Sequence, residues 1–218
     1  MAVPGRRRSR REERKEETRA ELIAAAARVF ARSGFHGASL EAIAREAGYT
    51  TGAVYWHFTG KDDLFLAVFE AYTTTRVHEY AAVQRGVDDG DLPPRAWADQ
   101  WMRRLHDEPE LLVLILEFTV HAWRNPPLRQ AFADRMAAGR LAVARILEDE
   151  ATRAGFELPM PAEALGTAVR ELGTGLGLAK LIDPDGIPDR LFGDVVELVV
   201  RLVAASGRTQ PNRRKGTS

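Results

Sequence analysis

The stretch Ser39–Phe58, SLEAIAREAGYTTGAVYWHF, constrains the fold of this chain more than any other. The apolar side chains in its first half follow the i, i+3, i+4, i+7 spacing of one helical face: Leu40, Ile43, Ala44 and Ala47. Ser39 stands where a hydroxyl oxygen can accept from the free amides of a first helical turn. Gly48 stands where a left-handed backbone, which favours glycine, would end the helix. The sequence therefore predicts a helix that ends at Ala47.

A second short helix follows the turn. Thr50 can cap it, and Val54 and Phe58, four residues apart, would face inward. Small Ala44 allows two helices to cross closely at a steep angle. The remaining side chains would point outward: Thr51, Gly52, Tyr55 and Trp56. Such a pair is either an ordinary helical hairpin in a core or a helix-turn-helix that presents its second helix to a partner.

The flanking sequence gives the pair a specific context. Three consecutive pieces are AAARVFARSGFHGASL, EAIAREAGYTTGAVYWHF and GKDDLFLAVFE, between Ala25 and Phe69. They resemble the DNA-binding module of the tetracycline-repressor (TetR) family of bacterial transcription regulators, over about a fifth of the chain. The resemblance implies an all-helical homodimer, a small DNA-binding domain in each subunit and a divergent ligand-binding and dimerisation domain. Repression of transcription is the family's common habit and is the expected activity.

The resemblance also implies which residues contact double-stranded DNA. Hydroxyl, methyl and indole groups suit base edges in the major groove, and the expected base contacts are Thr51, Gly52, Ala53 and Trp56. Hydroxyl, imidazole and ammonium donors suit phosphates, and the expected phosphate contacts are Ser39, Thr50, Tyr55, His57 and Lys61. Tyr55 could instead be a half-buried core residue. Ala53 departs from the more usual polar residue of the family, so recognition there would depend on shape or a methyl contact.

The charge distribution agrees with a single DNA-binding end. The whole chain has a net charge of zero, but residues 1–61 hold twelve basic and seven acidic residues. Residues 62–207 carry a net charge of −9, and the tail 208–218 has four basic residues and no acidic one. Five arginines lie between Arg6 and Arg11. We expect residues 1–17 to be a disordered basic arm, which would lie along DNA or serve only as a solvated tail.

Helical periodicity recurs along the rest of the chain, and no segment alternates as a strand would. We expect an all-α protein of about nine helices, with the first from Thr18 to Ser33. The later helices are expected at 61–84, 95–106, 109–123, 126–154, 162–182 and 188–205. The expected domains are a helix-turn-helix domain with its connecting helix at 18–84, a ligand-binding and dimerisation domain at 85–207, and a disordered tail at 208–218.

Large side chains on three successive helices could line a pocket for a mostly apolar inducer. They could equally be plain core: Trp97, Trp101, Met102, Phe118, His121, Trp123, Phe132 and Met136. The last two helices have wide apolar faces and are expected to form a homodimer through Leu165, Val169, Leu172, Leu176, Val195, Leu198, Val199 and Leu202. The run Gly173-Thr-Gly-Leu-Gly177 follows no strand, so close helix packing in that dimer explains it better than a dinucleotide site.

Several classes of function lack support in the sequence. There is no cysteine and no paired catalytic motif, so no metal, cofactor or enzymatic activity is expected. No leader or membrane-length apolar segment is evident, which favours a soluble cytoplasmic protein. Two alternatives to a ligand-controlled repressor remain open. One is a helical-bundle enzyme, and the other is a DNA-binding protein that needs no ligand.

Overall fold

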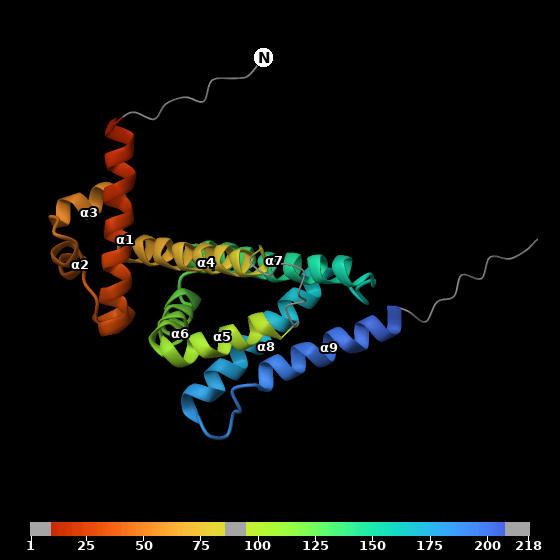
Figure 1. Ribbon diagram of the computed structural model, residues 1–218. Coiled ribbons are helices and arrows are strands. Elements are labelled where there is room, and N and C mark those ends of the chain that lie inside the picture. The colour runs from red at the N-terminus through yellow and green to blue at the C-terminus, as the bar shows by residue number, and fades with distance from the viewer. Residues whose placement is uncertain (1–9, 86–94, 208–218) are drawn as a thin grey trace, which may run out of the picture. The chain divides into compact units, whose positions relative to one another are not determined.

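The computed structural model describes residues 10–85 and 95–207, which form nine helices and no strand (Figure 1). This confirms the predicted all-α fold. The helices are α1 (Arg10–Gly37), α2 (Leu40–Ala47), α3 (Thr51–His57), α4 (Lys61–Arg85), α5 (Ala96–Asp107), α6 (Pro109–Trp123), α7 (Pro126–Ala154), α8 (Ala162–Ile182) and α9 (Leu191–Gly207). Within the described ranges, no helix is long and apolar enough to cross a membrane.

The chain divides into two compact units. Unit 1 combines the N-terminal helices up to Thr75 with Val113–Phe132, and unit 2 combines Arg76–Leu112 with the chain from Ala133 onward. Most of α6 therefore belongs with the N-terminal helices, whereas the sequence suggested that it belongs with the C-terminal domain. The predicted domain limits stay predictions. Residues 1–9, 86–94 and 208–218, which include most of the basic arm and the whole tail, lie outside the described residues.

Helix α1 begins well before the predicted start at Thr18. The segment from Arg10 contains no glycine or proline and places opposite charges three residues apart, as in Glu12 and Lys15. Such pairs stabilise a helix, and the acidic residues in its first turn also suit the positive end of the helix dipole. The prediction of a disordered arm over residues 1–17 is therefore wrong from Arg10 onward.

An aromatic core holds unit 1 together. Phe35 of α1, Phe65 of α4 and Phe118 of α6 are each at most 1% exposed. The rings of Phe65 and Phe118 stack with centroids 3.8 Å apart, and Phe35 meets Phe118 edge-on at 5.0 Å. Phe132 of α7 packs against Phe118 at 5.0 Å. Because aromatic rings bury large areas and pack in preferred geometries, this cluster fixes α1, α4 and α6 against one another.

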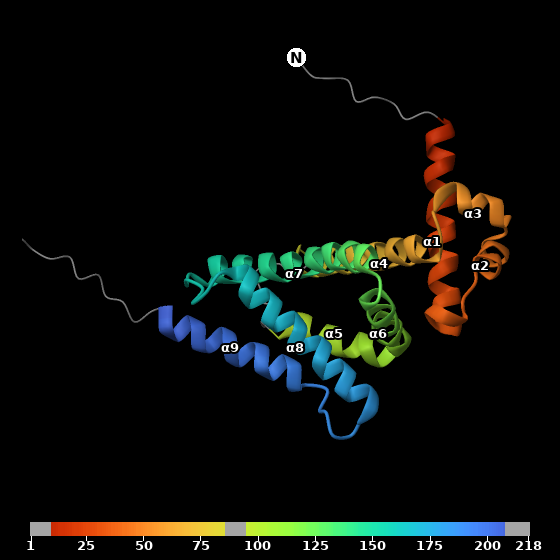
Figure 2. The same cartoon turned by 180° about the vertical axis from the view of Figure 1, so that it is seen from behind.

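Unit 2 has its own apolar core between α5, α8 and α9, which lie beside one another in Figure 2. The Phe192 side chain of α9 is 1% exposed, and a methyl group on Gly173 would come within 2.7 Å of its ring. A methyl group on Gly177 would collide with Leu105 of α5. The glycines at both ends of the GTGLG run therefore allow close packing within one subunit. The prediction that this run serves packing between subunits is wrong for these two positions.

The last helix begins at Leu191 rather than at the predicted Pro188. The preceding loop is held by its own polar contacts. The carboxylate of Asp183 accepts from the backbone N–H of Gly186 at 2.9 Å, and the Lys180 ammonium donates to the carbonyl of Ile187 at 2.8 Å. These hydrogen bonds keep the segment DPDGIP out of a helical conformation.

Candidate nucleic-acid interface

Two caps define the turn between α2 and α3. The Ser39 hydroxyl oxygen accepts from the backbone N–H of Ala42 at 3.1 Å, and that of Thr50 accepts from Ala53 at 3.2 Å. Gly48 adopts the left-handed conformation, with φ 76° and ψ 23°. All three were predicted from the sequence, and the end of α2 at Ala47 is confirmed. The Thr50 hydroxyl keeps its own O–H proton for a phosphate, whereas the Ser39 hydroxyl also hydrogen-bonds the Glu41 carboxylate and helps to lower the pKa of Glu41.

The inner face of α3 is anchored to α1 and α2. Val54 is 0% exposed and Phe58 is 2% exposed, as predicted, and Ile43 of α2 is fully buried. Ala44 is 2% exposed, consistent with a small residue at a close helix crossing. Figure 1 shows α2 and α3 on the same side of α1. This anchoring leaves the opposite face of α3 directed away from the unit.

Two large aromatic side chains lie on that outer face. Tyr55 is 59% exposed and Trp56 is 61% exposed. Gly52 is also exposed, while Thr51 and Ala53 are half-buried. The alternative in which Tyr55 is a half-buried core residue is not what the structure shows. Exposed aromatics beside a hydroxyl and a glycine offer stacking, methyl and hydrogen-bonding contacts to a partner.

Residues of α1 that the sequence did not single out lie beside α3. The Lys15 ammonium is 4.7 Å from the centroid of the Trp56 ring, and the Arg19 guanidinium is 5.1 Å from that of Phe58. Burial, followed by the charges of Lys15 and Arg19, lowers the pKa of the His57 imidazole below its usual value near 6.5. In the free protein, His57 therefore takes up a proton less readily than an ordinary imidazole.

Lys61 has intramolecular partners. Its ammonium donates to the carbonyl of Ala38 at 3.0 Å and to that of His36 at 3.4 Å, and it lies 4.7 Å from the Phe35 ring centroid. These contacts tie the first residue of α4 to the connection between α1 and α2. The phosphate contact expected for Lys61 stays a prediction, because one of its three donors can still turn outward.

The predicted ligand residues fall into both units. In unit 1, Phe118 and Phe132 are buried in the aromatic core, whereas Trp123 is 69% exposed beneath Arg129. The His121 ring lies 3.1 Å from an Asp62 carboxylate oxygen. The rings of Phe118, Phe132 and His121 thus lie in one aromatic cluster, with Phe118 5.0 Å from Phe132 and 5.9 Å from His121, and Trp123 lies at the surface.

The other four predicted ligand residues are in unit 2. Met102 is 2% exposed in the core, and Trp97 packs edge-on against Phe192 at 5.4 Å. The indole N–H of Trp101 is buried without a hydrogen-bond partner in the described structure. The sulfur of Met136 lies 3.2 Å from a guanidinium nitrogen of Arg170, a residue whose pKa is lowered by burial. The sequence reasoning missed Arg170, which has no apolar pattern to identify it.

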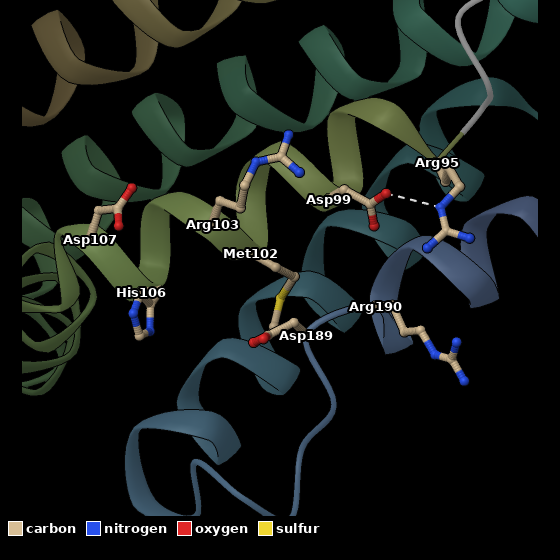
Figure 3. A pocket seen from close by; sticks show the side chains of 8 residues that line it. All are labelled: Arg95, Asp99, Met102, Arg103, His106, Asp107, Asp189 and Arg190. Atoms are coloured by element: carbon tan, nitrogen blue, oxygen red, sulfur yellow. Dashed lines mark hydrogen bonds and ion pairs between the residues drawn. The ribbon is translucent and has the colours of Figure 1, made fainter.

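A cavity of about 530 Å³ lies in unit 2 (Figure 3). Its lining is mostly charged and consists of Arg95, Asp99, Met102, Arg103, His106, Asp107, Asp189 and Arg190. Arg95 is already paired, because it donates to Asp99 at 2.9 Å and to Asp194 at 2.8 Å. Of the predicted ligand residues, only Met102 contributes to this cavity. It differs in chemistry from the apolar pocket expected from the sequence.

The predicted dimer residues divide by exposure. Leu198 and Leu202 of α9 are 55% and 58% exposed, and Leu172 of α8 is 39% exposed. Leu176, Val195 and Val199 are half-buried. Leu165 and Val169 are buried in the core of their own subunit. The exposed leucines are therefore the ones available to another chain, and the two buried residues support α8 from behind.

A capped turn between two short helices, with an outward-facing second helix, defines a helix-turn-helix protein. Residues 22–68 match the family model of bacterial regulatory proteins of the tetR family. The N-terminal part of this chain is therefore similar to the DNA-binding domain of TetR-family regulators, in agreement with the resemblance predicted from the sequence.

Three relatives illustrate the range of similarity. The HTH-type transcriptional regulator SrpR of Pseudomonas putida is 51% identical over 61 residues, which are 28% of this chain and 27% of SrpR. The HTH-type transcriptional repressor AcnR of Corynebacterium efficiens is 26% identical over 189 residues, covering 84% of this chain and 93% of AcnR. The crystal structure of the transcriptional regulator FadR from Bacillus subtilis, in complex with stearoyl-CoA, has a TM-score of 0.62 and 15% identity, covering 85% of this chain and 97% of that one.

These similarities differ in what they support. The relatives that match at 45% to 51% identity are covered over only 25% to 42% of their length, so they bear on the N-terminal domain. The likeness to FadR shows a shared fold. All three relatives named above are described as transcriptional regulators or repressors, in agreement with the class predicted from the sequence.

Proposed function

We propose that this protein is a sequence-specific DNA-binding transcriptional regulator that represses by occupying a palindromic operator. The observation that carries the proposal is the outer face of α3, where Tyr55 and Trp56 are more than half exposed on a helix anchored by Val54 and Phe58. A helix presented in this way fits the major groove, which admits one α-helix. The predicted contacts divide into base contacts from Thr51, Gly52, Ala53 and Trp56 and phosphate contacts from Ser39, Thr50, Tyr55, His57 and Lys61.

Selection of bound sequences from random DNA tests this function directly. The expected outcome is enrichment of a palindrome whose half-sites are about one helical turn, roughly 34 Å, or a multiple of it apart. Recovery of DNA without any common sequence would contradict sequence-specific recognition. The regulated genes would then be sought by locating the enriched palindrome.

We further propose that the active form is a homodimer built on α8 and α9. Support comes from the exposed leucines Leu198 and Leu202, which lie four residues apart on one face of α9, and from the exposed Leu172 of α8. Two subunits pairing through these helices would form a four-helix bundle and read two half-sites. Changing both Leu198 and Leu202 to glutamate should give a monomer by light scattering, with far weaker operator binding. A double variant that stays dimeric would exclude this interface.

The proposed control signal is a small, mostly apolar ligand that lowers DNA affinity. Support comes from the large side chains Trp97, Trp101 and Met136 of unit 2, and from the buried Trp101 N–H, which a ligand oxygen could satisfy. The fold likeness to FadR, which was solved with stearoyl-CoA, supports a ligand-binding role for this kind of unit. Helix α4 contributes residues to both units, so it is the natural element for transmitting the signal.

Linkage provides the test of ligand control. A ligand that weakens DNA binding tenfold must bind the operator complex tenfold more weakly than the free protein, a coupling of about 1.4 kcal/mol. Titration of candidate metabolites into both forms measures that ratio. If a ligand quenches the fluorescence of Trp101 but binds the free protein and the operator complex with equal affinity, this mechanism is excluded.

A regulator without a ligand is the second candidate. Three of the predicted ligand residues, Met102, Phe118 and Phe132, fill cores that are already packed. This favours a protein whose interior needs no ligand. This candidate would be supported if no member of a broad metabolite panel changed the affinity for the operator.

A further inference from the structure

We propose that the first turns of α1 form a second DNA-binding surface, in which Lys15 and Arg19 bind the phosphates beside the groove that α3 enters. The inference rests on the proposed DNA-binding function and adds residues outside the helix-turn-helix. The sequence analysis left open that residues 1–17 lie along DNA as a disordered arm, but it named neither Lys15 nor Arg19 as a contact.

The two cations lie beside the recognition helix. The Lys15 ammonium is 4.7 Å from the ring centroid of Trp56, and the Arg19 guanidinium is 5.1 Å from that of Phe58, the residue that ends α3. The major groove is about 12 Å wide, so a side chain at its centre is roughly 6 Å from a flanking sugar-phosphate backbone. A cation within 5 Å of Trp56 is therefore placed to reach a phosphate when Trp56 contacts a base.

The pattern along α1 explains why these cations are available. Leu22, Ala26 and Phe30 form a buried row on α1, which packs against α2 and, through Phe30, against Phe65 of α4. Continued toward the N-terminus at the same spacing, this row becomes Arg19 and Lys15, followed by Arg11. The packing face of α1 thus changes from apolar to basic where the helix runs past the core.

Both cations are exposed, with acidic residues around them on α1. On an ideal helix, Glu13 and Glu17 project away from Lys15, whereas Glu12 and Glu16 precede Lys15 and Arg19 by three residues and lie on the same side of the helix. Both cations also act electrostatically at α3, since their charges contribute to the lowered pKa of His57. Lys15 and Arg19 place positive charge beside α3, next to the rings of Trp56 and Phe58.

A merely structural role is the competing explanation, in which Lys15 only orients the Trp56 ring through a cation–π contact. The two roles differ in salt dependence. Each phosphate contact releases condensed counterions, so removing one such contact changes the slope of log K against log salt concentration by about 0.9. An orienting contact would alter the discrimination between DNA sequences without changing that slope.

The test compares operator and random DNA binding of the full chain across a salt series, after an operator has been selected. The double variant Lys15→Ala/Arg19→Ala should reduce the slope of log K against log salt concentration by about 1.8 per protomer. It should also weaken the binding of operator and of random DNA by the same factor, roughly fivefold per lost contact at 0.15 M salt. The charge-conserving variant Lys15→Arg/Arg19→Lys should keep the wild-type slope. Because both side chains are exposed, replacing them should change stability little, and each variant should melt near the temperature of the wild type.

Arg28→Ala is the matched control. It removes one positive charge from the same helix, so its effect is compared with half of the double variant's effect. Arg28 donates to Glu46 at 2.8 Å, and Arg32 also holds that carboxylate at 2.7 Å. Its salt slope should equal that of the wild type.

If the double variant keeps the wild-type slope of log K against log salt concentration, this inference is overturned. The proposed function still holds in that case, provided that the wild type prefers its operator to random DNA. A slope reduced in Arg28→Ala by half of the double variant's reduction would also overturn this inference, because the effect would then reflect total charge. If the wild type itself shows no preference for any DNA sequence, the proposed function fails, and this inference fails with it.

Discussion

Replacing Gly34 by alanine perturbs the junction between α1 and α6 in two separable ways. Gly34 has φ 68° and ψ 174°, a backbone conformation that is essentially restricted to glycine and costs other residues about 1–3 kcal/mol. A methyl group there would also lie 2.8 Å from a carboxylate oxygen of Glu117. That same oxygen accepts from the backbone N–H of Phe35 at 2.7 Å. The substitution therefore strains the chain and displaces an acceptor at once.

The expected decrease in stability follows from these two effects. A hydrogen bond to a charged group contributes about 1.5–3 kcal/mol, so Gly34→Ala should cost about 2.5–6 kcal/mol in all. For a protein of this size, each kcal/mol shifts the melting temperature by about 2–4 °C. Thermal unfolding followed by circular dichroism should therefore show a decrease of about 5–24 °C.

Gly48→Ala is the matched control for this prediction. Gly48 also has a positive φ of 76°, but nothing lies within 4 Å of the added methyl group, so only the backbone cost of about 1–2 kcal/mol applies. Combining Gly34→Ala with Glu117→Ala should cost less than the sum of the two single changes, because the removed carboxylate can no longer be displaced. If Gly34→Ala unfolds at no lower a temperature than Gly48→Ala, the assignment of Glu117 as the anchor of this junction is refuted.

Two further stability predictions concern His57 and the glycines of α8. Because the pKa of His57 is lowered in the folded state, the unfolded chain takes up its proton first as pH falls through about 6.5. Stability should therefore decrease below that pH. The melting temperature of His57→Gln should depend less on pH between pH 7.5 and 5.5 than that of the wild type. Identical plots of melting temperature against pH for the two proteins would contradict the lowered pKa. A methyl group on Gly166 would lie 2.7 Å from the backbone nitrogen of Ala144, so Gly166→Ala should destabilise by about 1–3 kcal/mol in urea unfolding. Gly175→Ala, which meets nothing within 4 Å, should instead stabilise by about 0.5–1 kcal/mol, and equal effects at both positions would refute the close approach of α7 and α8.

The helix-turn-helix could be predicted closely because its signals are local. A capping hydroxyl at Ser39, a glycine at Gly48 and a second cap at Thr50 each act within a few residues, and the structure places each as predicted. The start of α1 was missed because the prediction there was based on composition and not on the order of the residues. The arginine-rich composition suggested disorder, whereas the order of the charges from Arg10 onward favours a helix.

The contacts between distant segments could not be predicted in the same way. Nothing in the spacing of α6 indicates that Phe118 packs against Phe65, or that Glu117 accepts from the backbone of Phe35. An apolar pattern shows that a side chain is buried but not which partner buries it, and the predicted ligand set was divided between two cores for that reason. Lys15 was missed because its proximity to Trp56 is a tertiary contact.

The central claim is that the exposed face of α3 reads base edges, and the ratio of operator to random DNA affinity at one salt concentration measures it most directly. A good base contact contributes about 1–3 kcal/mol of discrimination. Trp56→Ala and Thr51→Ala should therefore each lower this ratio by about 5-fold to 150-fold, mainly through weaker operator binding. Lys61→Ala should leave the ratio unchanged, because a phosphate contact carries no sequence information. A ratio that stays at the wild-type value in both α3 variants would contradict the account.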